Sequence, residues 1–366
     1  MILHIAPDYM NKPLYHHLLE ALQSQENFCD HFVFACDNVV HNTQDIPHNV
    51  HVVNRSFSVL ERLLFFPKQK YLLNEVEQHI SLKNTELIHA HTLFSSGYIA
   101  YQQYKRLGIP YIVAVRNTDV NVFFKHMPHL RHIGREIAAN AQKIVFISPA
   151  YKKQVMGTYL PENLLEKTTV LPNGIDSIFL QNRTQHMPAE DIIRLIYVGR
   201  IEKDKNIHTI IEVTDRLISQ GYKVSLCLVG KIIDSEYKTT ISKRTYITWH
   251  DQCSKKEVLS YLRQNDIFIM PSYHETFGLV YAEAMSQGLP VIYTRGQGFD
   301  GFFEDGHVGY AVPCEDVNYI QNRILDIRKD YMTLSGHCKQ CADMFDWQQI
   351  AASYNNIYQH ISHGTR

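Results

Sequence analysis

Residues 271–290 read PSYHETFGLVYAEAMSQGLP, and this stretch decides the fold because it joins two buried strands through a helix. The apolar run at 266–270 stops at Pro271, and 291–293 form another short apolar run, as buried parallel strands do. The helix between them is predicted to begin at Thr276, with Thr276 or Glu275 as its cap. Its first amides would then be unpaired donors at the positive end of the helix, and they belong to Thr276, Phe277, Gly278 and Leu279. A diphosphate fits such a helix end.

Two glutamates accompany this helix. Glu275 precedes it and Glu283 lies within it, at a predicted separation of roughly 12 Å along the helix axis. One carboxylate can accept hydrogen bonds from the hydroxyls of a sugar while the other accepts them from a ribose. The alternative is a solvent-facing helix with ordinary acidic residues in its first turns, where acids are favoured anyway.

A second segment, 194–206, reads RLIYVGRIEKDKN and predicts a strand, a glycine turn and a basic loop. Such a loop lies at the carboxyl edge of a parallel sheet, where the ligands of open α/β sheets bind. Gly199 would let the backbone approach a ligand, and Arg200 and Lys205 would neutralise phosphate charge. Taken alone, the segment could also be a solvated basic turn.

Together, Gly199, Arg200, Lys205 and the stretch from Glu275 to Glu283 resemble the family-four retaining glycosyltransferases. The resemblance is strongest over 195–313, and the segment LPNGID at 171–176 also matches the family. It implies the GT-B fold, in which two Rossmann-like domains flank a cleft. It also implies that Arg200 and Lys205 hold the donor diphosphate, that Glu275 contacts the donor sugar, and that Glu283 contacts the ribose. By the same resemblance Glu275, Arg200 and Lys205 are the candidate catalytic residues.

The composition bounds the class of protein. The chain of 366 residues is long enough for two domains of ordinary size. Its 36 basic and 37 acidic residues nearly cancel, which argues against a nucleic-acid partner. Seven scattered cysteines are most simply read as reduced thiols in a cytoplasm. The first residues predict a strand rather than a signal peptide, and no apolar run has a membrane-spanning length, so we expect a cytoplasmic protein.

Strands and helices alternate along the chain, which predicts an α/β fold with two doubly wound sheets. The strands are expected at 2–5, 31–35, 50–53, 87–90, 111–115, 144–147, 169–171, 195–198, 224–229, 246–249, 267–270, 291–293 and 310–312. The polar stretch 181–191 is interpreted as a linker. The expected domains are an acceptor-side domain at 1–180, a nucleotide-sugar domain at 181–345, and a helix at 346–366 that crosses back to the first domain.

The acceptor is expected on the first domain. Arg116, Asn117 and Asp119 follow a predicted strand end, and His91 follows another, so these four are candidate residues of the acceptor-side cleft. His89 is interpreted as a core histidine. Many members of the family carry a histidine and a glycine where Arg116 and Asn117 stand, so a histidine contact to the donor sugar is not carried over to this turn.

A mixed apolar and basic segment at 55–71 predicts a weak contact with a membrane surface, which would make the protein peripheral on the inner face of the membrane. The alternative is a core helix followed by a basic loop.

The predicted function is transfer of a hexosyl unit, with retention, from a nucleotide diphosphate sugar to a hydroxyl. A UDP-sugar is favoured as donor, and a glycan or lipid-linked molecule of surface polysaccharide synthesis as acceptor. No Asp-x-Asp metal motif is present, so we expect no metal and no cofactor. The alternatives are a nucleotide-sugar epimerase of the same architecture and a non-catalytic nucleotide-sugar-binding subunit.

Overall fold

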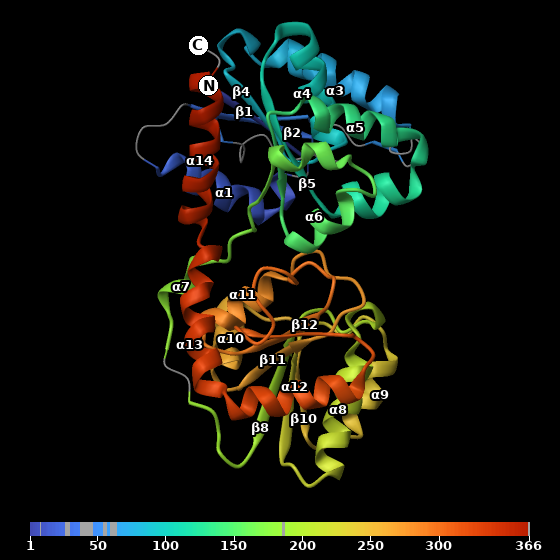
Figure 1. The fold of residues 1–366 in the computed structure, drawn as a ribbon, viewed down its shortest axis with the longest axis vertical. Coiled ribbons are helices and arrows are strands. Elements are labelled where there is room, and N and C mark those ends of the chain that lie inside the picture. Colours follow the sequence, from blue (N-terminus) through green and yellow to red (C-terminus); the bar gives the residue numbers. More distant parts are fainter. Residues whose placement is uncertain are drawn as a thin grey trace. The chain divides into compact units, whose positions relative to one another are not determined.

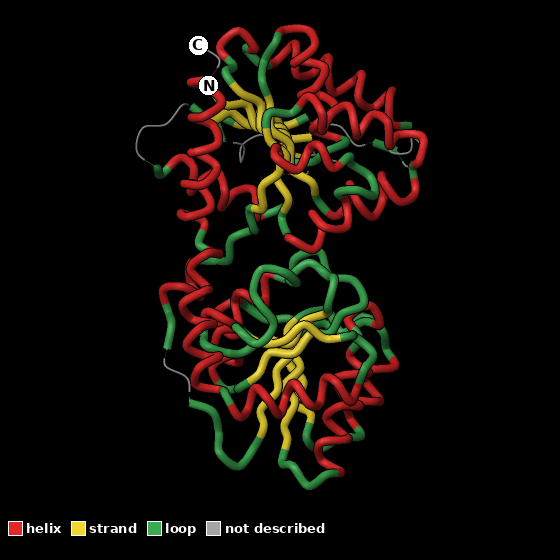
Figure 2. Tube along the Cα trace, viewed as in Figure 1, coloured by secondary structure: helices red, strands yellow, loops and turns green. Residues whose placement is uncertain are grey.

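The computed structural model describes residues 1–7, 9–25, 30–36, 47–53, 57–58, 64–184 and 187–364. The chain divides into two compact units. The first comprises Met1–Ile147, Tyr151–Asn173 and Trp347–Arg366, and the second comprises Ser148–Ala150 and Gly174–Asp346. In each unit, strands form a central sheet with helices on both sides (Figure 2).

The first unit contains a seven-stranded parallel sheet in the order β3-β2-β1-β4-β5-β6-β7. Four of its strands, β1, β2, β4 and β5, are labelled in Figure 1. Its strands are β1 (Ile2–Pro7), β2 (His31–Cys36), β3 (Val50–Val52), β4 (Leu87–Ala90), β5 (Tyr111–Val115), β6 (Lys143–Phe146) and β7 (Thr168–Val170). Its helices are α1 (Pro13–Gln23), α3 (Phe65–His79), α4 (Ser95–Leu107), α5 (Arg131–Asn140) and α14 (Trp347–Gly364), and α6 (Pro149–Val155) starts in residues of the second unit.

One face of the first sheet is covered by α1 and α14. Leu18 and Leu22 of α1 and Ile350 of α14 are buried in one apolar cluster with Val33 of β2 and Leu87 of β4. Helix α4 packs against β1, β4 and β5. This arrangement explains why β4 and β5 are buried at every position, since a parallel sheet between two helical layers has no solvent-facing side.

The second unit contains a six-stranded parallel sheet in the order β10-β9-β8-β11-β12-β13. Its strands are β8 (Ile193–Val198), β9 (Val224–Val229), β10 (Ile247–His250), β11 (Ile267–Met270), β12 (Val291–Thr294) and β13 (Gly309–Val312). Its helices are α7 (Ser177–Gln181), α8 (Ile207–Ser219), α9 (Glu236–Ser242), α10 (Lys255–Arg263), α11 (Leu279–Ser286), α12 (Val317–Lys329) and α13 (Tyr331–Cys341).

The strand order reverses direction once in each sheet. In the second sheet β8 is followed in sequence by β9 and β10 on one side, while β11, β12 and β13 extend the sheet on the other. The loops after β8 and β11 therefore diverge at this switch point. Ligands of open α/β sheets bind at such a point, outside the carboxyl ends of the strands.

The α/β class and the two doubly wound sheets predicted from the sequence are confirmed, and each expected strand is present within about two residues. The polar stretch 181–191 is not where the units divide, because the boundary lies between Asn173 and Gly174 and this stretch belongs to the second unit. In the described part of the chain, no helix is both long and apolar enough to span a bilayer.

Candidate functional site

The loops that follow β8 and β11 are bonded to each other at the switch point of the second sheet. The backbone amide of Tyr273 donates to the carbonyl oxygen of Asp204 at 2.9 Å. Next to this bond, Lys205 Nζ lies 2.8 Å from Glu275 Oε2, and both side chains are largely buried. Two of the residues predicted for the donor site are thus an ion pair.

Asn206 holds the loop after β8 in place. It is the one non-glycine residue with a positive φ in the described chain, at 56°, and it directly precedes α8. Its side-chain amide donates to the carbonyl oxygens of Pro271, at 2.9 Å, and Cys314, at 2.6 Å. Because these carbonyls follow β11 and β13, Asn206 ties three strand ends together and places Lys205 beside Glu275.

The loop that carries Glu275 is held by hydrogen bonds with the segment after β12. Gln297 Oε1 accepts from the amide of Glu275 at 3.0 Å, and the amide of Gly298 donates to the Glu275 carbonyl oxygen at 2.8 Å. A Cβ atom on Gly298 would lie 2.1 Å from the carbonyl oxygen of Thr276, a contact that backbone atoms cannot relieve without moving. Only glycine therefore fits at this position.

The helix after this loop begins later than predicted. It starts at Leu279 with Gly278 as its N-cap at φ 75°, and no side chain caps it, so the prediction that Thr276 or Glu275 caps the helix is wrong. The amide of Thr276 is already engaged by its neighbour Glu275 Oε1, at 3.0 Å. Of the four predicted donors, only Gly278 and Leu279 belong to the helix end, and Thr276 and Phe277 belong to the loop. The 12 Å separation derived for a continuous helix does not apply.

A side chain would not fit at Gly278. The ring of Tyr281 lies about where the Cβ atom would be, at 2.4 Å from its ideal position, and the φ of 75° strains any other residue. The aromatic ring and the backbone conformation therefore both require glycine here.

Glu283 lies in α11 and is half-buried. Burial raises the pKa of its carboxyl to about 7, and the negative charge of Asp176 adds to this, while the positive charge of Lys255 opposes it. Asp176 and Lys255 form an ion pair at 2.8 Å, and Asp176 also caps α7. The segment 171–176, which the sequence linked to the same family, thus lies near this glutamate.

Arg200 is the most exposed of the predicted donor residues. Its side chain is 67% exposed and pairs with Glu202 at 2.9 Å. Its carbonyl oxygen accepts from the buried hydroxyl of Tyr197 at 2.7 Å, which fixes the backbone just after Gly199. Because an exposed ion pair contributes little free energy, the guanidinium can turn to an anionic ligand at small cost.

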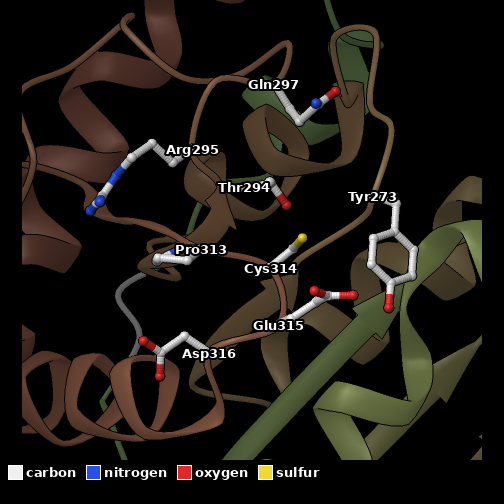
Figure 3. Close-up of a pocket in the computed structure, with 8 residues that line it drawn as sticks. All are labelled: Tyr273, Thr294, Arg295, Gln297, Pro313, Cys314, Glu315 and Asp316. Carbon is white, nitrogen blue, oxygen red and sulfur yellow. The ribbon is translucent and has the colours of Figure 1, made fainter.

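A pocket of about 650 Å³ opens beside these loops (Figure 3). Its lining residues come from the ends of β12 and β13 and the loop after β11, and they are Tyr273, Thr294, Arg295, Gln297, Pro313, Cys314, Glu315 and Asp316. Gln297 links the pocket to the loop of Glu275, since it accepts the hydrogen bond from the Glu275 amide. The pocket therefore borders the loop of the ion pair, but neither Lys205 nor Glu275 is among the residues that line it.

The predicted acceptor residues of the first unit differ in exposure. His91 and Asp119 are buried, at 1% and 0% exposure, so the structure does not support them as contacts for an acceptor. Asp119 instead accepts hydrogen bonds from the amides of Phe94 and Arg116, and burial raises its pKa to about 6. Arg116 is half-buried and Asn117 is exposed, so these two keep surface for a ligand.

Part of the segment predicted to meet a membrane, 54–56 and 59–63, lies outside the described residues. In the rest, Phe65 is buried at the start of α3, while Leu64 and Phe66 are 55% and 48% exposed. The described residues thus show both an exposed apolar pair and a core contact.

Sequence reasoning missed the roles of Asn206, Gln297 and Gly298. Asn206 stands next to the basic loop and carried a usable signal, since asparagine is favoured where a chain must adopt a positive φ before a helix. Gln297 and Gly298 are 22 or more residues from the loop they support, and no local pattern connects them to it.

The comparisons with known proteins concern the family and the fold. Residues 14–178 match the family model described as Glycosyltransferase Family 4, and residues 179–343 match the one described as Glycosyl transferases group 1. An uncharacterized glycosyltransferase of Methanocaldococcus jannaschii is 25% identical over 304 residues, which cover 80% of this chain and 81% of that protein. The capsular polysaccharide biosynthesis glycosyltransferase CapM of Staphylococcus aureus is 27% identical over 239 residues, which cover 59% of this chain and 62% of that protein.

Among solved structures, HepE of Anabaena in complex with UDP has a TM-score of 0.71 at 16% identity. The match covers 98% of this chain and 99% of HepE, so both units share their architecture with that structure.

Proposed function

Because the chain belongs to family four of the glycosyltransferases and has their GT-B fold, we propose that it transfers a hexosyl unit from a UDP-sugar to a hydroxyl of a glycan or lipid-linked acceptor. The observation that carries this proposal is the Lys205–Glu275 pair at the switch point, with Glu283 on the adjoining helix. A cation for phosphate, a carboxylate for sugar hydroxyls and a second carboxylate for ribose are the groups that a nucleotide sugar needs.

The two partners of the ion pair are proposed to divide when the donor binds. Lys205 turns to the diphosphate, together with Arg200 and the amides at the start of α11, and Glu275 turns to the hydroxyls of the sugar. The ion pair holds both side chains near their working positions beforehand, so little side-chain freedom is lost on binding.

The difficult step of the reaction is departure of the nucleoside diphosphate, which gains negative charge as the bond from its β-phosphate oxygen to the sugar breaks. Arg200, Lys205 and the helix amides stabilise that charge, the role that a divalent ion plays in other transferases. In a retaining transfer the acceptor oxygen bonds the anomeric carbon on the face that the diphosphate leaves, and the departing phosphate takes the acceptor proton. Glu275 orients the sugar during this exchange.

A surface polysaccharide is the proposed destination of the sugar, supported by the similarity to the capsular enzyme of Staphylococcus aureus. Arg116 and Asn117 are the proposed acceptor contacts, because they keep exposed surface at the end of β5. The exposed Leu64 and Phe66, near Lys68 and Lys70, support a weak contact with an anionic membrane surface. Less co-sedimentation with anionic vesicles for a variant with both lysines changed to glutamine is the expected sign of this contact.

The direct test incubates the protein with UDP-, GDP- and ADP-sugars, with and without an acceptor glycan, and separates the products. Transfer from a UDP-sugar only in the presence of acceptor is the expected result. An altered sugar nucleotide formed without acceptor would instead identify an epimerase. Binding of the nucleotide sugar without any turnover would identify a non-catalytic subunit.

A further inference from the structure

Three buried histidines of the first unit bring their ring nitrogens together on one face of the sheet. His4 lies on β1, and its partner in register on β4 is His89. His91 follows His89 by two residues, a spacing that points both side chains of an extended chain to the same face. The three imidazoles are at most 1% exposed, and one ring nitrogen of each lies within 4.8 Å of the other two.

Two of the three histidines use one ring nitrogen for a hydrogen bond to a residue outside the cluster, which leaves the other nitrogen facing the cluster. His4 Nε2 lies 2.8 Å from His31 Nδ1, and His89 Nδ1 lies 2.7 Å from the hydroxyl of Tyr358 on α14. His4 Nδ1 is left 3.1 Å from His91 Nε2, and both His89 Nε2 and the outer nitrogen of His91, Nδ1, are buried without a hydrogen-bond partner. A buried ring nitrogen without a partner is costly, so the cluster is incomplete as it stands.

We propose that His4, His89 and His91 bind a divalent transition-metal ion, zinc in the first place. Imidazole nitrogens suit zinc, copper and nickel, whereas magnesium and calcium require oxygen ligands. In a tetrahedral zinc site, with bonds of 2.0 to 2.1 Å, neighbouring ligand nitrogens are about 3.4 Å apart. The His4–His91 separation of 3.1 Å is close to this value. The His89 and His91 rings are stacked, with centroids 4.0 Å apart and planes 23° apart, so these rings would have to turn for their nitrogens to meet at one ion.

The surroundings of the cluster resemble those of known metal sites in one respect. A metal-binding histidine usually bonds an outer group through its other nitrogen, which fixes the ring, and His4 and His89 do so through His31 and Tyr358. The hydrogen bond between His4 Nδ1 and His91 Nε2 requires a proton on one of these two nitrogens. An ion bound to both would displace that proton, so binding should strengthen as the pH rises.

Of the charged groups near the cluster, one would oppose a bound cation and another would favour it. The positive charge of Arg116 lies close enough to lower the pKa of His89 and His91, and it would also repel a cation. The buried carboxyl of Asp119 interacts with Arg116 and offsets part of this repulsion. Three protein ligands leave a fourth position on a tetrahedral ion, and a hydroxide or another anion there would lower the net charge further.

The site differs from the proposed transfer chemistry in place and in role. Its ligands lie on β1, on β4 and just past β4 in the first unit, whereas the donor residues lie in the second, and Tyr358 connects the site to α14. An ion here would therefore join α14 to the centre of the first sheet as a structural element. This departs from the expectation that the chain needs no metal.

The test measures metal content in protein prepared without a polyhistidine tag. Cells grown with added zinc should yield wild-type chain with about one zinc per molecule after desalting, and His89→Gln should retain less than a tenth of that. Cobalt in place of zinc should give the strong visible absorption bands of a tetrahedral site. A wild-type protein that takes up no zinc in cells, and binds neither zinc nor cobalt when these are added to the purified protein, would overturn the proposal.

A matched control uses the other group of possible ligands in the described chain, His51, Glu75 and His79, which is more exposed. The double variant His51→Gln/His79→Gln should keep its zinc. Loss of zinc from this variant, with zinc retained in His89→Gln, would assign the ion to the surface group instead. If His89→Gln does not fold, removal of zinc from the wild type by a chelator should lower its melting temperature, and added zinc should restore it. An unchanged melting temperature would contradict a structural ion.

Discussion

Lys205 and Glu275 are partners in the structure, yet their proposed tasks are opposite in charge, so substitutions should separate them. Lys205→Met should weaken UDP binding by roughly ten- to a hundredfold, since a charge-assisted hydrogen bond to phosphate is lost. It should also lower turnover by about a hundredfold or more, because the leaving group loses a preorganised cation. Calorimetry with UDP and a transfer assay measure the two effects.

Glu275→Gln should behave differently. It removes a negative charge next to the diphosphate and releases Lys205, so UDP affinity should be unchanged or higher, while turnover falls because the sugar is no longer oriented. Equal losses of UDP affinity in the two variants would contradict the proposed division of the pair.

Glu283 should make nucleotide binding depend on protons. Its carboxyl, with a pKa raised to about 7 by burial, is partly protonated at neutral pH. Ribose hydroxyls donating to it favour the ionised form, so UDP binding at pH 7 should release up to about half a proton from this group, because the group is about half protonated at its pKa. Calorimetry in buffers of different ionisation enthalpy measures the release, and Glu283→Gln should abolish this part. Identical proton release in the variant would rule out Glu283 as the ribose contact.

The same glutamate gives a stability prediction with a definite sign. The folded-state pKa of about 7 lies above the ordinary value of 4.5, so the folded protein holds this proton more tightly. The resulting stabilisation is complete below pH 4.5 and is lost as the pH rises through 7. The free energy of unfolding of Glu283→Gln minus that of wild type should therefore increase from pH 5 to pH 8, by at most about 3 kcal/mol. Denaturant unfolding at both pH values tests this, and a constant difference would contradict it.

At the scale of elements, the segment after β12 determines where the Glu275 loop lies. Gly298→Ala would place a methyl group 2.1 Å from the Thr276 carbonyl oxygen, so the loop must move. We expect turnover to fall at least tenfold, since small displacements of positioned groups are costly in rate. Gly336→Ala in α13 is the matched control, because no atom lies within 4 Å of its Cβ position, and its activity should equal that of wild type. An active Gly298→Ala protein would show that the loop tolerates the shift.

The elements themselves were largely predictable from the sequence, because buried parallel strands are short apolar runs with clear ends. The start of α11 was not predictable. Gly278 is its N-cap with a positive φ, and the ring of Tyr281 fills the space of a side chain there. In the sequence, Thr276 is an equally good capping signal. The histidine cluster was also beyond reach. His4 and His89 meet only because β1 and β4 are neighbours in register, which depends on the order of strands.

At the scale of the whole molecule, the two units should unfold separately, because each is a compact unit with its own sheet. Ile350→Ala removes buried side-chain volume from α14 and should destabilise the first unit by about 2–5 kcal/mol. UDP at a hundred times its dissociation constant should stabilise the second unit by about 2.7 kcal/mol. Scanning calorimetry should then show two transitions, of which Ile350→Ala lowers one and UDP raises the other. A single transition that responds to both changes would show that the units unfold together.

The assignment of α14 to the first unit has a consequence for biosynthesis. When residues 1–173 have left the ribosome, the face of the first sheet that Trp347, Ile350 and Tyr354 will cover is still bare. Residues 174–346, by contrast, contain the complete second sheet with its helices and can fold as soon as they emerge. The nascent enzyme therefore completes its later-made unit first, against the usual order of synthesis, and its earlier-made unit exposes apolar surface to chaperones until α14 arrives.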